Sequence, residues 1–218
     1  MISLALGGVE RPVRRILCIG AHSDDLEIGC GATIMRLVAR YPDVAIRWVV
    51  LSGDDRRAAE ARCGANLVLS ESRNPEVVTK SFRDGFFPQS GVEIKEYFES
   101  LKTEPTWDVI FTHYRGDLHQ DHRTVAELTW NTFRNHMILE YEIPKYDGGL
   151  GDPNVFVPID DETRTRKTTA LVTAFGSQRD KRWFSKETFD ALMRIRGVEC
   201  ASPTGYAEAF YGRKLSLE

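Results

Sequence analysis

Short apolar runs alternate with helical patterns along most of this 218-residue chain. Residues 15–20 and 44–51 are mostly apolar runs of strand length, as strands buried on both faces require. Between them, apolar residues recur at the spacing of one helix face, at Ile28, Ala32, Met35 and Ala39. Strands that alternate with helices predict an α/β fold with an open, mainly parallel sheet and helices on both of its faces.

The rest of the chain continues this pattern. Further strands are predicted over residues 77–82, 107–111 and 154–159, and one more begins at Tyr141 and is interrupted by Pro144. Helices are predicted over residues 56–67, 92–101, 121–135, 160–175 and 186–196. We expect the less regular last third to extend the same sheet, so that residues 1–218 form a single domain, a length at which one core can be well buried.

Charge and hydropathy exclude several classes of protein. The formal net charge of −3 argues against a nucleic-acid or anionic-membrane binder, because both need a basic face. No stretch approaches the roughly 20 apolar residues of a spanning helix. The mildly apolar residues 1–8 precede the basic Arg11, Arg14 and Arg15, the reverse of the order in a secretory signal. We therefore expect a cytoplasmic protein without nucleic-acid or membrane partners.

The four cysteines are scattered and include no C-x-x-C pair. We expect them to be buried free thiols rather than a disulfide framework or a thiolate metal site. They are Cys18, Cys30, Cys63 and Cys200.

Histidines and carboxylates gather just after two of the predicted strands. One group, residues 21–25 (Ala-His-Ser-Asp-Asp), follows the first strand. The other, residues 117–122 (Asp-Leu-His-Gln-Asp-His), follows the strand predicted over residues 107–111. Because parallel strands end at the same edge of a sheet, we expect the two groups to meet there.

These residue types can build a catalytic metal site. A catalytic zinc ion takes three nitrogen or oxygen ligands and keeps one position open. His22 and Asp25 supply two such ligands, and His122 can complete the set. Asp24, next to Asp25, cannot easily share its bonding direction and is left as a base near the metal. His119 could stay protonated and face a developing oxyanion or a leaving group.

Each part of this arrangement also has a structural explanation. An isolated His-x-x-Asp is common, and Asp-Asp before a helix is often only an N-cap with favourable charge. His119 and His122 could be solvated loop residues. Both groups lie at strand ends, and the chain has only five histidines, so we favour the functional interpretation. His113 and His136 are interpreted as structural or exposed.

Two glycines at the start of the first helix, Gly29 and Gly31, do not form a nucleotide-binding loop. That fingerprint, G-x-G-x-x-G, stands directly after the strand, whereas here the glycines come later and no third glycine follows. Close packing of the helix on the sheet is the expected reason for them.

At this point the sequence resembles the LmbE-like, or PIG-L, family of metal-dependent N-acetylglucosamine deacetylases. The family's first motif, A-H-P-D-D with a Gly-rich helix start, resembles residues 21–31, and its second, H-x-D-H, resembles residues 119–122. Further similar stretches lie at residues 141–144, 154–157, 177–178 and 206–210. The resemblance therefore covers nearly the whole chain.

The resemblance implies a Rossmann-like fold and a role for each residue of the two motifs. These roles are zinc ligation by His22, Asp25 and His122, general-base catalysis by Asp24, oxyanion stabilisation or acid catalysis by His119, and orientation of His119 by Asp121. It also suggests sugar contacts for Arg57 and for Asp84, although Arg57 could only face solvent and Asp84 could only form a turn.

The sequence departs from the family pattern in two places. Ser23 replaces the usual Pro, which loosens the backbone of the ligand loop but keeps a hydrogen-bonding side chain. The loop over residues 52–57 looks shorter than usual, which leaves the size of the substrate open. A role for Glu208 in the 206–210 stretch is left between site and structure.

We therefore expect a hydrolase that removes an N-acetyl group from an amino sugar or sugar conjugate, with zinc or another divalent metal such as iron(II). Two alternatives use the same residues. One is a non-haem iron enzyme, whose facial triad is also two histidines and one carboxylate. The other is a Rossmann-like module that binds a sugar or nucleotide without turnover. Trp183, Phe184 and residues 147–151 could form a lid or a contact in a homo-oligomer.

Overall fold

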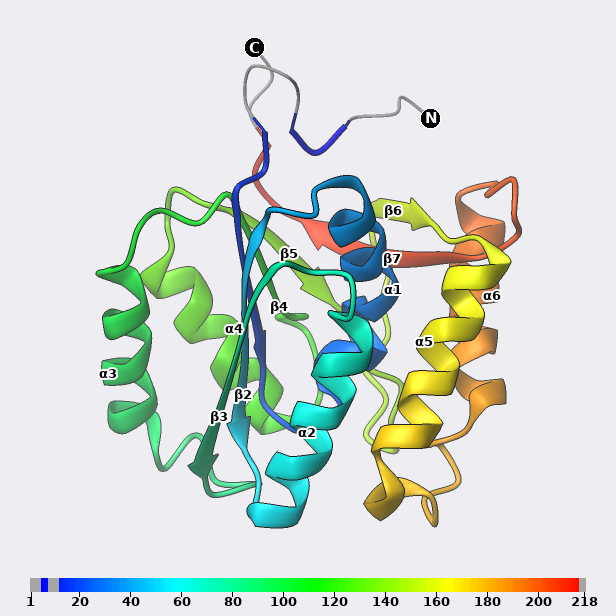
Figure 1. Cartoon of the computed structure of the whole chain (residues 1–218). Helices are drawn as coiled ribbons and strands as arrows, with labels where there is room; N and C mark the ends of the chain where they lie inside the picture. The colour runs from blue at the N-terminus through cyan, green and yellow to red at the C-terminus, as the bar shows by residue number, and fades with distance from the viewer. Residues whose placement is uncertain (1–4, 8–11, 216–218) are drawn as a thin grey trace.

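The computed structural model describes residues 5–7 and 12–215 (Figure 1). The strands are β1 (Arg15–Gly20), β2 (Ala45–Ser52), β3 (Asn74–Phe82), β4 (Val109–His113), β5 (Met137–Tyr141), β6 (Val155–Pro158) and β7 (Ala207–Gly212). The helices are α1 (Asp25–Arg40), α2 (Asp55–Val68), α3 (Gly91–Lys102), α4 (Gln120–Thr132), α5 (Asp161–Ala174) and α6 (Lys186–Glu199), with a short 3₁₀ helix η1 (Gly176–Gln178). The expectation about a leader rests largely on residues 1–4 and 8–11, which lie outside the described residues.

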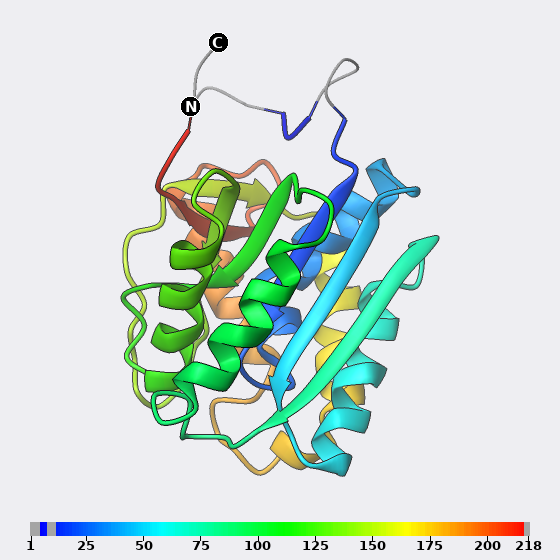
Figure 2. The ribbon, with the colours of Figure 1, turned by 90° about the vertical axis from the view of Figure 1, so that its left-hand side faces the viewer.

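The strands form one sheet in the order β3-β2-β1-β4-β5-β7-β6. The first five strands of this order are mutually parallel, and β7 runs antiparallel to both of its neighbours. Helices α3 and α4 cover one face, and α1, α2, α5 and α6 lie on the other (Figures 1 and 2). This confirms the predicted mainly parallel, Rossmann-like α/β fold. The limits of the domain at residues 1 and 218 stay a prediction.

The alternation of side chains along β1 explains why this strand is apolar throughout. Ile16 and Cys18 pack in the core under α1 and α2, whereas Leu17 and Ile19 pack in the core under α3 and α4. All four side chains are fully buried. A central parallel strand with helices on both faces has no solvated side, so it reads as a continuous apolar run.

Three predictions need correction. The strand expected to begin at Tyr141 ends there, because the apolar residues that pair with β4 precede it. Strand β7 was not predicted, since its buried Glu208 interrupts the apolar pattern. Cys63 is exposed because α2 turns Ala61 and Gly64 inward and residue 63 outward, whereas the other three cysteines are buried as expected.

Gly29 allows α1 to pack closely on the sheet. A Cβ atom at residue 29 would lie 2.1 Å from the ring of Tyr141, so only glycine fits beside that ring. The Tyr141 hydroxyl donates to the Ile19 carbonyl at 2.8 Å, which fixes the ring between α1 and β1. A Cβ at Gly31 would make only ordinary contacts, so the packing explanation holds for the first glycine and not for the second.

Glu208 ties the far edge of the sheet to α1. Its carboxylate accepts hydrogen bonds from the amides of Ala32 at 2.9 Å and Thr33 at 2.7 Å. Lys167 of α5 donates to the same carboxylate and to the Ile28 carbonyl, both at 2.6 Å. Between a site role and a structural role, these contacts favour the structural role for Glu208. The buried pair of Glu208 and Lys167 joins β7 and α5 to α1, the helix that begins at Asp25.

Replacing Glu208 with Gln should destabilise the fold by about 3–5 kcal/mol, because the Lys167 ammonium is left buried without its counter-charge. The free energy of unfolding in urea measures this. The control is Glu99→Gln, whose ion pair with Lys95 is half exposed and, being screened by solvent, should contribute little to stability. Equal losses for the two variants would contradict a structural role for the buried pair.

Candidate active site

The two predicted groups of histidines and carboxylates meet at the point in the sheet where the order of the strands reverses. Strands β1 and β4 are neighbours, with β2 and β3 following on one side and β5 on the other. A crevice forms at the carboxyl ends of two such strands, and ligands bind there in open α/β sheets. Residues 21–24 follow β1 and residues 114–119 follow β4, so both loops open into this crevice.

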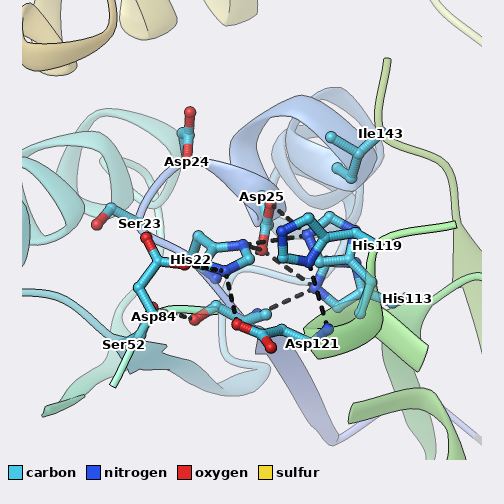
Figure 3. Close-up of polar contacts among 12 residues, drawn as sticks. His22, Ser23, Asp24, Asp25, Ser52, Asp84, His113, His119, Asp121 and Ile143 are labelled. Carbon is cyan, nitrogen blue, oxygen red and sulfur yellow. Dashed lines mark hydrogen bonds and ion pairs between the residues drawn. The ribbon is translucent and has the colours of Figure 1, made fainter. Parts of the chain in front are cut away.

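Three side chains converge in it with the spacing of metal ligands, and Figure 3 labels two of them, His22 and Asp25. His22 Nδ1 lies 3.1 Å from His122 Nε2 and 3.3 Å from Asp25 Oδ2, and His122 Nε2 lies 3.5 Å from Asp25 Oδ1. Donors at zinc–nitrogen and zinc–oxygen distances from a tetrahedral ion stand about 3.4 Å apart. The two imidazole nitrogens and the two oxygens of the Asp25 carboxylate therefore have spacings that suit a zinc ion.

Asp25 is held in place by two contacts to its Oδ2 atom, which leave its other oxygen toward the crevice. Its Oδ2 atom accepts the backbone amide of His22 at 2.6 Å and lies 3.1 Å from His113 Nε2. His113 is fully buried, and its ring stacks on His122 with centroids 3.9 Å apart. His113 was expected to be structural or exposed. It is structural and directly behind the site, and its place at the end of β4 was the signal that it belongs to this edge.

Other donor sets overlap with the first. One joins Asp25, His113 and His122, and another joins His22, Asp84 and Asp121. One nitrogen from each of His22, His119 and His122 also lie within 4.8 Å of one another. His119 is the N-cap of α4, and its Nδ1 accepts the backbone amide of Asp121 at 3.3 Å. The proton of neutral His119 is therefore on Nε2. His119 can act as a hydrogen-bond donor in the crevice or compete with Asp25 as a ligand.

Asp121 orients a different histidine from the one expected. Its Oδ2 atom lies 3.3 Å from His22 Nε2, and no contact of its carboxylate with His119 is found. The same carboxylate accepts the amides of Gly85 at 2.7 Å and Phe87 at 3.1 Å. These two backbone amides lie in the turn after β3, and the Asp121 carboxylate accepts a hydrogen bond from each of them. The hydrogen bond between residues 121 and 119 is made by the backbone amide of Asp121.

Asp117 orients the other ring and was not singled out from the sequence. Its Oδ2 atom lies 3.1 Å from His122 Nδ1, and its Oδ1 atom accepts the His119 amide at 2.7 Å. A carboxylate on the far nitrogen of a ligating histidine fixes its tautomer and direction. Its place two residues before His119 was a sequence signal for such a role.

Asp24 lies at the rim of the same crevice and keeps a free oxygen. The Asp24 side chain is buried, and its Oδ2 atom has no hydrogen-bond partner among the described residues. Arg57 donates from Nη2 to Asp24 Oδ1 at 3.1 Å and from Nε to Ser23 Oγ at 3.0 Å. In Figure 3, Asp24 stands apart from the contacts around His22. Arg57 is thus bound beside Asp24 rather than in solvent.

Asp84 forms a turn and also reaches the site. Its Oδ1 atom lies 3.0 Å from His22 Nε2, although the side chain is 71% exposed. Gly85 follows it with φ +77°, a conformation that favours glycine. Together with Arg57 and Asp24, Asp84 lines the pocket above the histidines.

The local environment keeps His122 and Asp25 in their metal-binding forms. For His22, burial lowers the pKa, but Asp25, Asp121 and Asp84 outweigh burial and raise the pKa well above its usual value, so His22 releases a proton when it binds a metal. Burial lowers the pKa of His122 to about 3, so its imidazole is neutral at pH 7. Although burial acts in the other direction, His122, His113 and His22 hold the pKa of Asp25 well below its usual value. Burial raises the pKa of Asp24, with Arg57 opposing it, which makes this carboxylate a better base. Burial and the nearby His22 lower the pKa of His119, which favours its neutral form over the protonated one considered above.

The environment of Asp117 leads us to expect that the free energy of unfolding depends on pH. Burial raises the pKa of the Asp117 carboxyl group. His122 and Lys145 outweigh this effect and lower the pKa to about 2. The unfolded carboxyl titrates near pH 3.9, so the stabilisation is complete above about pH 4 and is lost as the pH falls through about 2. The difference in unfolding free energy between the metal-free protein and its Asp117→Asn variant should shrink by about 2 kcal/mol between pH 5 and pH 2. A constant difference would contradict the ionised contact.

The far wall of the pocket comes from two other segments. One is residues 143–147, which follow β5, and the other is residues 178–183, which begin at the last residue of η1. Both contribute side chains to the lining. Trp183 belongs to this wall, whereas Phe184 is buried in the core beside Phe175. The suggestion of a lid or subunit contact therefore applies at most to Trp183 and the 147–151 loop.

Among the described residues, no helix is long and apolar enough to cross a membrane.

The sequence is similar to known proteins. A family model described as GlcNAc-PI de-N-acetylase, PIG-L, matches residues 17–133. The uncharacterized deacetylase YaiS of Escherichia coli is 29% identical over 170 residues, which cover 72% of this chain and 88% of that protein.

Solved structures share the fold at lower identity. The N,N'-diacetylchitobiose deacetylase of Pyrococcus horikoshii matches with a TM-score of 0.66 and 18% identity, over 91% of this chain and 83% of that one. The 4-carboxy-2-hydroxymuconate hydratase GalB of Pseudomonas putida matches with a TM-score of 0.71 and 15% identity, over 94% and 98%. Because the second of these is a hydratase, fold alone does not decide the reaction.

Proposed function

Because the chain belongs to the PIG-L family, the GlcNAc-PI de-N-acetylases, we propose that it is a metal-dependent N-deacetylase acting on a small N-acetylated sugar or sugar conjugate. One observation carries this proposal. His22, Asp25 and His122 converge with the spacing of zinc ligands, and the unpaired Asp24 carboxylate oxygen lies in the same pocket. A metal site with a free base beside it is what amide hydrolysis by water requires.

Each step of the proposed reaction is assigned to a particular residue of the chain. A zinc ion held by the three ligands supplies Lewis acidity toward water and the acyl oxygen. Asp24 Oδ2 takes the proton of the attacking water as the new carbon–oxygen bond forms. His119, protonated on Nε2, donates a hydrogen bond to the oxyanion that develops on the acyl oxygen. The carbon–nitrogen bond then breaks, and the departing amine receives a proton from Asp24 or His119.

Two further residues are placed to bind the sugar. Arg57 fixes Asp24 through one amino group and lines the pocket, so its remaining donors can reach a sugar hydroxyl. The exposed Asp84 carboxylate can accept a hydrogen bond from another hydroxyl. These contacts would orient the acetamido group toward His22 and His122.

Acetate release from a panel of N-acetylated sugars and sugar conjugates tests the proposal. Zinc-loaded protein should release acetate and a free amine in equal amounts from at least one member of the panel. Oxygen uptake by the iron(II)-loaded protein without acetate release would favour the non-haem iron alternative. Tight sugar binding without any product would favour the binding module.

A further inference from the structure

Lys145 is a nearly buried cation in the wall of the pocket. Its side chain is only 7% exposed, and it lies in the segment that follows β5. Its ammonium donates to Asp117 Oδ2 at 2.6 Å and to the carbonyls of Ile143 and Gly148, each at 3.1 Å. All three N–H donors therefore have acceptors, so the position of the ammonium is fixed by the protein itself.

The carboxylate oxygen that Lys145 contacts is the one that faces His122. Asp117 Oδ2 lies between the Lys145 ammonium and His122 Nδ1, which is 3.1 Å away. The other oxygen, Oδ1, accepts the amide of His119 at 2.7 Å. With one oxygen on a backbone amide and the other on a fixed cation, the carboxylate plane of Asp117 has little freedom to rotate.

The segment that carries Lys145 is itself held to the body of the domain. The buried carboxylate of Glu142 accepts a hydrogen bond from Arg196 Nη2 of α6 at 2.7 Å. It accepts another from the backbone amide of Gly151 at 2.8 Å. The same Arg196 nitrogen donates to the Gly151 carbonyl at 2.9 Å. Because Glu142 and Gly151 flank Lys145 on both sides, the ammonium is positioned by a rigid loop rather than by a flexible chain.

We propose that Lys145 is a positioning residue for the metal ligand His122, acting through Asp117. The inference rests on the metal site proposed above and extends it by a residue that neither sequence motif contains. Fixing Asp117 Oδ2 fixes the direction of His122 Nδ1–H, and this sets the direction of the Nε2 lone pair toward the metal. The wall of the substrate pocket and the metal ligand are thereby joined through three side chains.

Metal binding without substrate tests this relay. Zinc affinity is measured by competition with a chelating dye for wild-type protein and for Lys145→Met, whose side chain is apolar and of similar length. Loss of partners behind a ligating histidine typically costs 10–100-fold in metal affinity, and we expect about tenfold for this more distant residue. The visible absorption of the cobalt(II)-substituted protein should change in intensity as the ligand set distorts. Lys95→Met, which removes a lysine–carboxylate pair on α3, should change neither quantity.

A double-mutant cycle separates the relay from a general loss of packing. If Lys145 acts through Asp117, the double variant Lys145→Met/Asp117→Asn should bind zinc as weakly as Asp117→Asn alone. Additive losses, or zinc affinity and a cobalt spectrum in Lys145→Met equal to wild type, would overturn the proposal. Wild-type protein that binds no zinc would overturn both the relay and the metal site. If Lys145→Met does not fold, Lys145→Gln serves the same comparison.

Discussion

Replacing Asp24 with Asn should lower kcat for deacetylation by about 10²–10⁴-fold, the usual contribution of a general base. The amide has the same size as the carboxylate but cannot take a proton from water at neutral pH. Because Asp24 Oδ2 has no hydrogen-bond partner among the described residues, placing the amide nitrogen there removes an acceptor from no other residue. Zinc content should stay the same, since Asp24 makes no contact with His22, Asp25 or His122 through its free oxygen.

The matched control for this variant is Asp55→Asn. Asp55 is a nearby acidic residue in the first turn of α2, and it is exposed. Its loss changes the net charge equally and should leave kcat within a factor of two or so, because only a weak helix-dipole interaction is removed. Steady-state acetate release measures both variants. An Asp24→Asn protein with wild-type kcat would show that another group takes the proton.

Replacing His122 with Ala should remove both metal and activity. His122 belongs both to the proposed ligand set and to the set of His22, His119 and His122, so neither of these two sets keeps three donors after its loss. Metal content after dialysis should fall from one equivalent to near zero, and turnover should disappear with it. Metal analysis of the purified variant gives the first value, and acetate release gives the second.

His119→Ala is the informative comparison, because it distinguishes the two donor sets. If the ligands are His22, Asp25 and His122, His119→Ala should keep its metal and lose about 10²–10³-fold in kcat, as expected for one oxyanion donor. If His119 replaces Asp25 as a ligand, His119→Ala should lose the metal and Asp25→Asn should keep it. The second result would require the roles of the two residues to be exchanged.

The parts of the fold that could be predicted are those that depend on local patterns. Strand β1 is apolar because helices cover both of its sides, so its sequence alone identified it. Strand β7 was missed because Glu208, a residue atypical of buried strands, is stabilised by Lys167 from another helix and by amides of α1. Such compensation comes from contacts between residues far apart in sequence, which no local pattern reveals.

The same distinction holds for the site. The two groups of histidines and carboxylates could be placed together because parallel strands end at one edge. The contacts behind them could not be predicted. The end of β4 places His113 at this edge, but its contact with Asp25, like that of Lys145 with Asp117, forms only when the sheet has formed. Asp121 was placed beside the wrong histidine because the two free amides after β3, at Gly85 and Phe87, could not be foreseen as its partners.

The most direct test of the central claim is a zinc titration of metal-free protein with acetate release as the readout. We expect no release at the start, a rise in rate with each addition, and a break at one equivalent of zinc per chain. The substrate is the best member of the N-acetylated panel. Acetate release that is equally fast in the presence of a strong chelator, or no release at any metal content from any member of the panel, would contradict a metal-dependent deacetylase.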